Sequence, residues 1–231
     1  EYDATKAILN LTTTTNRRNM SYDDITTKLG RMTGYTDAIT SSASASLTTE
    51  RGMSLIRYDS KNRMTGYTDI TREYNSAGTN SLDTYTRTVR SEMRYDDTGT
   101  SITNLGRLRY YVDTITADPD HSTLSPNPNL ITVKTVTIDP RTNTGYDSKN
   151  RMLGYAEVSR EYNKAHDSVI EGAELDLTTN TIRSSMAYDD AATRLGRLTG
   201  YTDNITSSAS TNLTTVRGMS LLGYDSKNRM T

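Results

Sequence analysis

The side chains that could carry out chemistry in this chain are two histidines and three pairs of adjacent aspartates. His121 and His166 are the only histidines, and the sequence contains no cysteine. Metal sites and catalytic triads need several side chains that converge on one point. Neither histidine occupies a matching position in the repeat, and neither has a cysteine companion. We therefore predict no catalytic residue and no metal ligand at either histidine.

The aspartate pairs Asp23-Asp24, Asp96-Asp97 and Asp189-Asp190 each follow a tyrosine. Paired carboxylates can act as a general acid and a general base, but such catalysis needs one site, whereas these pairs recur along the chain. Turn formation explains the recurrence better, because aspartate side chains accept hydrogen bonds from nearby backbone amides. A low-affinity calcium site at these turns is the alternative, since calcium takes carboxylate and carbonyl oxygens.

The composition excludes several functions and restricts others. The 27 basic and 28 acidic residues nearly cancel, so no strong field would attract nucleic acid or an anionic membrane. No apolar run is long enough for a transmembrane helix. Leucine, isoleucine and valine supply only 37 of 231 residues, and phenylalanine is absent. So low a content is also found in disordered chains, but those usually carry a large net charge. We therefore favour an ordered protein.

The elements that must position these side chains are repeated. The phrase Tyr-Asp-Ser-Lys-Asn-Arg-Met occurs at 58–64, 146–152 and 224–230, and residues 20–65 align without a gap with residues 186–231. Stacked copies of one supersecondary unit usually form an extended scaffold. The spacing of apolar residues is two rather than 3.6, which predicts strands. The expected fold is all-β, an elongated array of stacked antiparallel hairpins in a spiralling or solenoid-like sheet, with one face lined by tyrosine, methionine, leucine and isoleucine.

Recurring Glu-Tyr pairs divide the chain into three predicted repeat units, 1–72, 73–160 and 161–231, and the third is truncated relative to the others. The second unit carries a predicted insertion at 114–142 that holds all four prolines. Proline cannot donate a hydrogen bond to a β-ladder, so it gathers where a sheet is interrupted. Within the insertion, the β-branched run 130–138 predicts a strand.

Each Tyr-Asp-Ser-Lys-Asn-Arg-Met phrase is predicted to be a β-hairpin with a three-residue loop. Asn62 would adopt a left-handed conformation, and Asp59 would pair with Arg63 across the loop and accept hydrogen bonds from its amides. Tyr58 would lie opposite Met64, and Ile56 opposite Gly66. Glycine replaces the asparagine before arginine in the Leu-Gly-Arg copies, as a positive-φ position requires. The predicted structural positions are Tyr58, Asp59, Asn62, Arg63, Tyr146, Asp147, Asn150, Arg151, Tyr224, Asp225, Asn228, Arg229, Gly30, Gly106 and Gly196.

The pattern of Tyr-Asp, then glycine or asparagine, arginine, leucine or methionine and a second tyrosine resembles the YD repeat of RHS-type proteins. That family includes bacterial RHS and insecticidal-complex shells, wall-associated bacterial proteins and the teneurins. The resemblance covers most of the chain outside 114–142. It implies long antiparallel hairpins stacked into a spiralling sheet, which in several relatives is a hollow shell. It implies no catalytic residue, and the self-cleaving acidic core of RHS shells is not recognisable in this sequence.

These observations predict a non-catalytic structural repeat segment of a large secreted bacterial protein that builds an extracellular filament or surface fibre. Its expected partners are copies of itself or neighbouring repeats, end to end, and it needs no cofactor. One alternative is a wall segment of an RHS-type toxin-encapsulating shell. The other is an adhesin or glycan-binding repeat protein, in which the 114–142 insertion or the tyrosines contact glycans at a cell surface.

Overall fold

The computed structural model describes ten stretches of the chain. They are residues 12–24, 29–42, 44–75, 82–97, 106–118, 130–138, 145–163, 175–189, 196–220 and 223–224. The predicted positions Asp225, Asn228 and Arg229, both histidines, all four prolines and Glu1-Tyr2 lie outside these residues.

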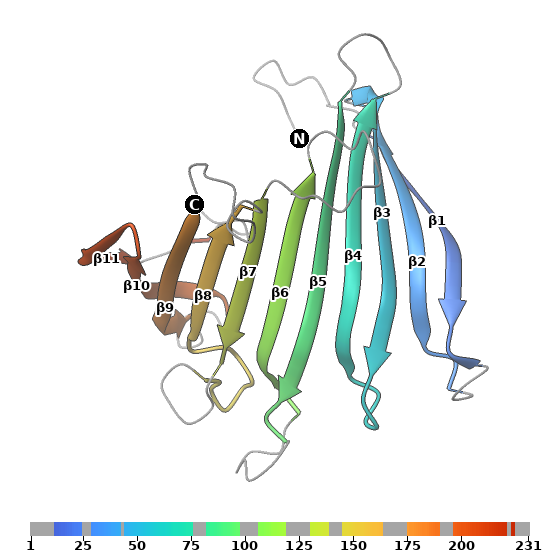
Figure 1. Ribbon diagram of the computed structural model, residues 1–231. Helices are drawn as coiled ribbons and strands as arrows, with labels where there is room; N and C mark the ends of the chain where they lie inside the picture. Colours follow the sequence, from blue (N-terminus) through green and yellow to red (C-terminus); the bar gives the residue numbers. More distant parts are fainter. Residues whose placement is uncertain are drawn as a thin grey trace. The chain divides into compact units, whose positions relative to one another are not determined.

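The structure confirms the all-β prediction. Every named element is a strand, each strand is a hydrogen-bonded neighbour of the next in chain order, and every register described is antiparallel (Figure 1). The eleven strands are β1 Thr13–Tyr22, β2 Met32–Ser41, β3 Ser44–Tyr58, β4 Met64–Asn75, β5 Asp83–Tyr95, β6 Leu108–Asp118, β7 Leu130–Thr137, β8 Tyr155–Tyr162, β9 Asp176–Tyr188, β10 Leu198–Ser207 and β11 Ser210–Met219.

The chain separates into two compact units, each described by itself. The first unit is Glu1–Arg90 with Ile115–Leu130, and the second is Ser91–Thr114 with Ile131–Thr231. The first unit contains β1 to β4 and most of β5, and the second contains β8 to β11. The predicted strand at 130–138 exists as β7, although β6 also extends into the predicted 114–142 insertion, as far as Asp118.

Threonine and tyrosine are the commonest residues of the strands, as their preference for a pleated, half-buried surface predicts. In β4 the run Thr68-Asp69-Ile70-Thr71 lies opposite Val89 to Thr86 of β5 without a break in register. In contrast, β3 is shifted against β4 near its end, between Ser54 and Tyr58. The shift coincides with Leu55, which has φ 51° and an exposed side chain. This combination is a β-bulge, in which one extra residue is left out of the ladder.

The bulge corrects one sequence prediction. Tyr58 lies opposite Met64 as expected, but Gly66 pairs with Arg57 rather than with Ile56. The additional residue at Leu55 shifts the register by one position. The side chain of Ile56, the next residue, is buried. A left-handed residue lies three places before the tyrosine in all four Tyr-Asp copies for which this position is described: Asn19, Leu55, Glu92 and Ser185.

The buried residues differ from the expected face of tyrosine, methionine, leucine and isoleucine. Among the described residues, the buried apolar side chains are Ile56, Val136 and Ile138. Aspartates are buried at least as often, at Asp37, Asp96, Asp113 and Asp203. Burying a carboxylate is costly unless it is paired and hydrogen-bonded. The partners of these aspartates are therefore central to how the strands hold together.

Candidate functional site

The hairpin turn after β3 shows how one repeated site is built. Asp59 accepts hydrogen bonds at Oδ1 from the amides of Lys61 (2.8 Å) and Arg63 (3.0 Å). Its Oδ2 accepts from Nε and Nη2 of Arg63, at 2.8 and 2.6 Å. The backbone amide of Asp59 donates to the Arg63 carbonyl at 2.9 Å. Asn62 closes the loop with φ 62°, which is the left-handed conformation predicted for it.

The same arrangement recurs at every described Tyr-Asp turn, whatever the length of the loop. The amide and Nε of the arginine donate to the two oxygens of one aspartate in each case, and a glycine or asparagine with φ between 62° and 70° precedes the arginine. The pairs are Asp23–Arg31, Asp59–Arg63, Asp96–Arg107, Asp147–Arg151 and Asp189–Arg197. We call them the turn pairs. The residues with positive φ are Gly30, Asn62, Gly106, Asn150 and Gly196.

The turn pairs differ in their exposure to solvent. The side chain of Asp96 is fully buried and that of Arg107 is 10% exposed, whereas Asp59 and Arg63 are 22% and 19% exposed. Burial raises the pKa of Asp59, but the hydrogen bonds from the Arg63 side chain and from the Arg63 and Lys61 amides outweigh it and hold that pKa below its usual value. The pKa of Asp147 is lowered by the same balance.

Four of the turns are also joined to the preceding one by a tyrosine. The hydroxyl of the tyrosine donates to the carbonyl of the methionine or leucine that follows the preceding arginine, and that arginine stacks on the tyrosine ring. The hydroxyl bonds are Tyr58–Met32 (2.7 Å), Tyr146–Leu108 (2.6 Å), Tyr188–Met152 (2.6 Å) and Tyr224–Leu198 (2.7 Å). The stacked arginines are Arg31, Arg107, Arg151 and Arg197, 4.7, 4.7, 4.2 and 4.5 Å from the ring centroids.

Turn pairs and tyrosines together form a turn ladder. Arg31 shows the connection most clearly, because it pairs with its own Asp23, stacks on Tyr58 and donates to Asn62 Oδ1 of the next turn at 3.0 Å. Arg107 reaches Asn150 in the same way, at 3.4 Å. Arg31 and Arg107 thus hold their own turns closed and also fix the position of the next turn.

The tyrosine connection can be tested with one hydroxyl group. We expect Tyr188→Phe to lower the free energy of unfolding by about 0.5–1.5 kcal/mol, the usual net contribution of one hydrogen bond. Tyr22→Phe is the matched control, because Tyr22 is 46% exposed and, among the described residues, its hydroxyl contacts only the sulfur of Met20. Urea denaturation followed by circular dichroism measures both. Equal losses in the two variants would contradict the ladder.

A second set of contacts joins side chains that face each other on neighbouring strands. Arg17 of β1 faces Asp37 of β2, with Nε to Oδ1 and Nη2 to Oδ2 both at 2.8 Å. Arg183 and Asp203, 166 residues later, repeat the pair at 2.7 and 2.8 Å. The hydrogen bonds from the arginine lower the pKa of each aspartate. We call these two the strand pairs.

Further arginine–aspartate bridges join β3 to β4, β4 to β5, and β8 to β9. They are Arg51–Asp69, Arg72–Asp83 and Arg160–Asp176.

The directions of the pKa shifts predict how the free energy of unfolding depends on pH. Asp37, Asp59, Asp147 and Asp203 have lowered pKa values in the folded state. Their stabilising effect is therefore complete above the unfolded value of about 3.9 and is lost as the pH falls below it. Burial raises the pKa of three tyrosines, so their effect is complete below the unfolded value of about 10 and is lost as the pH rises beyond it. The tyrosines are Tyr146, Tyr155 and Tyr188.

We accordingly expect the free energy of unfolding to be nearly constant from about pH 5 to pH 9 and to fall on both sides. Urea titrations at intervals across pH 2–12 measure this, and tyrosine absorbance reports the alkaline limb. A stability maximum below pH 4 would contradict the role of the paired aspartates.

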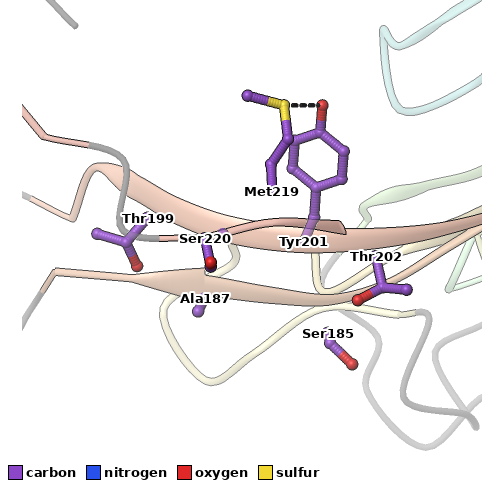
Figure 2. Close-up of a pocket in the computed structure, with 8 residues that line it drawn as sticks. Ser185, Ala187, Thr199, Tyr201, Thr202, Met219 and Ser220 are labelled. Carbon is purple, nitrogen blue, oxygen red and sulfur yellow. Dashed lines mark hydrogen bonds between the residues drawn. The ribbon is translucent and has the colours of Figure 1, made fainter. Parts of the chain in front are cut away.

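An open groove of about 590 Å³ lies beside β9, β10 and β11. Figure 2 shows Tyr201 and Met219 pointing to one side of these strands, where the tyrosine hydroxyl contacts the methionine sulfur at 2.7 Å, and Ser185 on the other side. Apart from Tyr201 and Met219, its lining consists of small side chains, namely serine, threonine, alanine and glycine. The groove contains none of the turn pairs or strand pairs.

Among the described residues there is neither a group of side chains placed to hold a metal ion nor a helix that could span a membrane. In those residues no group of three or more histidine, cysteine, aspartate or glutamate side chains is placed to hold a metal ion. Asp24, the second aspartate of the first pair, lies beside the turn pair Asp23–Arg31. Its Oδ1 is 3.2 Å from the position that a Cβ on Gly30 would occupy. No helix among the described residues is long and apolar enough to span a membrane.

Comparisons with known proteins found no matching family model, no matching curated protein and no matching solved structure. The resemblance to YD repeats therefore stays a prediction from the sequence.

Proposed function

We propose that this chain is a non-catalytic structural repeat segment of a large secreted bacterial protein, and that it builds an extracellular filament or surface fibre. The observation that carries the proposal is the repetition of one set of contacts. Five turn pairs share the same hydrogen bonds, and four tyrosines reach the preceding turn in the same manner. A catalytic site is normally built once, whereas contacts that recur along the chain serve to join one hairpin to the next.

The strand edges support assembly into a longer structure. β1 is the first strand in the sheet order and β11 the last, and among the described residues each has one neighbouring strand. Unpaired edges are templates for further strands. Apolar side chains that are exposed here include Leu213 at 61% and Val216 at 65%, both on β11. The proposed partners are accordingly copies of this chain or neighbouring repeats.

Electron microscopy of the concentrated chain, together with analytical ultracentrifugation, tests this proposal. We expect filaments with a regular axial repeat. Thr15→Lys places a charge on the edge strand β1 and should shorten or abolish them, because charged residues at an edge discourage strand addition. Thr86→Lys in β5, which has neighbours on both sides, is the control and should leave assembly intact.

Two other results would count against a filament. A chain that stays monodisperse at high concentration would contradict the proposal. Hollow closed particles would instead favour the shell that the RHS resemblance implies.

A further inference from the structure

Strands with the same sequence pattern recur at every fourth strand along the chain. This recurrence indicates which kind of strand lies beside which. β1, β5 and β9 all end at the tyrosine of a Tyr-Asp pair, and each carries an arginine five residues before it: Arg17, Arg90 and Arg183. We call these three the arginine strands. β4 and β8 both carry Arg-Glu-Tyr close to their ends, and each has another tyrosine seven residues before the tyrosine of that segment, Tyr67 and Tyr155. We call these two the Arg-Glu-Tyr strands.

Two of the three arginine strands pair with an Arg-Glu-Tyr strand, in the same register. Tyr67 of β4 lies opposite Arg90 of β5, and Tyr155 of β8 lies opposite Arg183 of β9. The guanidinium carbon of the arginine lies 5.5 Å from the centroid of the tyrosine ring in both pairs. The two contacts occur in different compact units of the chain, so the geometry is a property of the strand pair rather than of one location.

The third arginine strand, β1, pairs only with β2 among the described residues. Its strand pair matches that of β9: Arg17 bonds Asp37 and stacks on Tyr35 at 3.9 Å, as Arg183 bonds Asp203 and stacks on Tyr201 at 3.8 Å. The difference is exposure. The Arg17 side chain is 45% exposed and the Arg183 side chain 24%.

The exposure of the other residues on the two strands shows the same contrast. All ten residues of β1 are exposed, while Thr179 and Thr181 of β9, which lie between register partners on β8 and on β10, are half-buried. Among the described residues, β1 thus presents a completed strand pair with no strand on its outer side, and this side corresponds to the side that β8 covers on β9.

We propose that the outer edge of β1 binds an extended peptide strand of the Arg-Glu-Tyr type, with its first tyrosine opposite Arg17. Resting on the proposed scaffold function, this names the partner that the edge accepts. Backbone hydrogen bonds along an exposed edge supply affinity, and alternate side chains supply selectivity. The first tyrosine of the peptide adds a cation–π contact with Arg17. After this tyrosine, the peptide carries in turn an acidic residue, a β-branched aliphatic residue and Arg-Glu-Tyr.

The test uses the whole chain and a fluorescently labelled peptide with the sequence of residues 155–162. We expect saturable binding in anisotropy titrations and slower amide hydrogen exchange in β1. Alanine in place of the first tyrosine of the peptide, or Arg17→Ala in the protein, should weaken binding about threefold to tenfold, the loss expected of a cation–π contact. Arg57→Ala removes the same charge from an exposed position on β3 and should leave binding unchanged.

Absence of saturable binding would overturn the inference. So would slower exchange in β11 instead of β1, or binding that Arg217→Ala in β11 weakens and Arg17→Ala does not. These results are separate from those for the scaffold function. Filaments formed by a chain that does not bind the peptide would refute only this contact. Peptide binding by a chain that never assembles would support the contact and contradict the filament.

Discussion

Replacing Asp96 by alanine should lower the free energy of unfolding by about 3–5 kcal/mol, the cost of removing one partner from a buried ion pair. The Asp96 side chain is fully buried, and Arg107 is 10% exposed. Without the carboxylate, Nε of Arg107 and the Arg107 amide both lose their acceptor. Total stabilities are commonly about 5–15 kcal/mol, so this single change removes a large part of the total.

Asp59→Ala is the matched control for this variant, because Asp59 makes the same hydrogen bonds in a more open turn. Its side chain is 22% exposed, and water can replace part of the lost interaction, so the loss should be clearly smaller. Urea denaturation followed by far-ultraviolet circular dichroism compares the two. If both variants lost the same stability, burial would not determine the strength of the turn pairs.

The sequence was sufficient to predict the features that depend on local chemistry. The all-β fold followed from the spacing of two and from the strand-forming residues. The turn after β3 followed from Asp59, Asn62 and Arg63. These residues are close together in the sequence, so the hydrogen bonds from the loop amides to the aspartate and the positive φ of the asparagine depend on local chemistry alone. The glycines at positions 30, 106 and 196 were predictable for the same reason, and all three have positive φ.

Features that depend on the neighbouring strand were missed. The bulge residue three places before each tyrosine is Asn19, Leu55, Glu92 or Ser185, four residue types with no common conformational preference. Sequence reasoning therefore placed Ile56 rather than Arg57 opposite Gly66. The strand pairs were missed too, because Arg17 and Asp37 meet only when β1 and β2 are aligned. Their repetition at Arg183 and Asp203 was the one sequence signal that could have revealed them.

The expected apolar face reflects a wrong assumption about what stabilises this sheet. With so few leucine, isoleucine and valine residues, most strands bury little apolar area, and aspartates occupy several of the most protected positions. Tyrosine serves less as a core residue than as a connector, since its ring covers an arginine and its hydroxyl bonds a carbonyl of the preceding hairpin. Isolated surface ion pairs contribute little, so it is the connection of these pairs into a ladder that we infer to be stabilising.

Alanine at Gly154 should destabilise the second compact unit by about 1–3 kcal/mol, the usual cost of overpacking. A Cβ at this position would lie 2.3 Å from the carbonyl oxygen of Arg183 and 3.2 Å from the Cα of Ser184, both backbone atoms of β9. A backbone atom cannot rotate away as a side chain does, so β9 would have to move and the Arg183–Asp203 strand pair with it. The glycine is needed because of the adjacent strand, not because of its own φ.

Gly218→Ala in β11 is the control for this argument, because nothing lies within 4 Å of the added Cβ. It should be neutral or raise the free energy of unfolding by about 0.4–1 kcal/mol, since alanine restricts the unfolded chain more than glycine does. Tyr110 lies three residues after Arg107, as Gly154 lies three after Arg151, so the turn itself accepts a side chain there. Thermal denaturation of both variants separates the two explanations: a small loss in Gly154→Ala would mean that β9 is free to shift, whereas a large loss means that the close approach of the two strands is fixed.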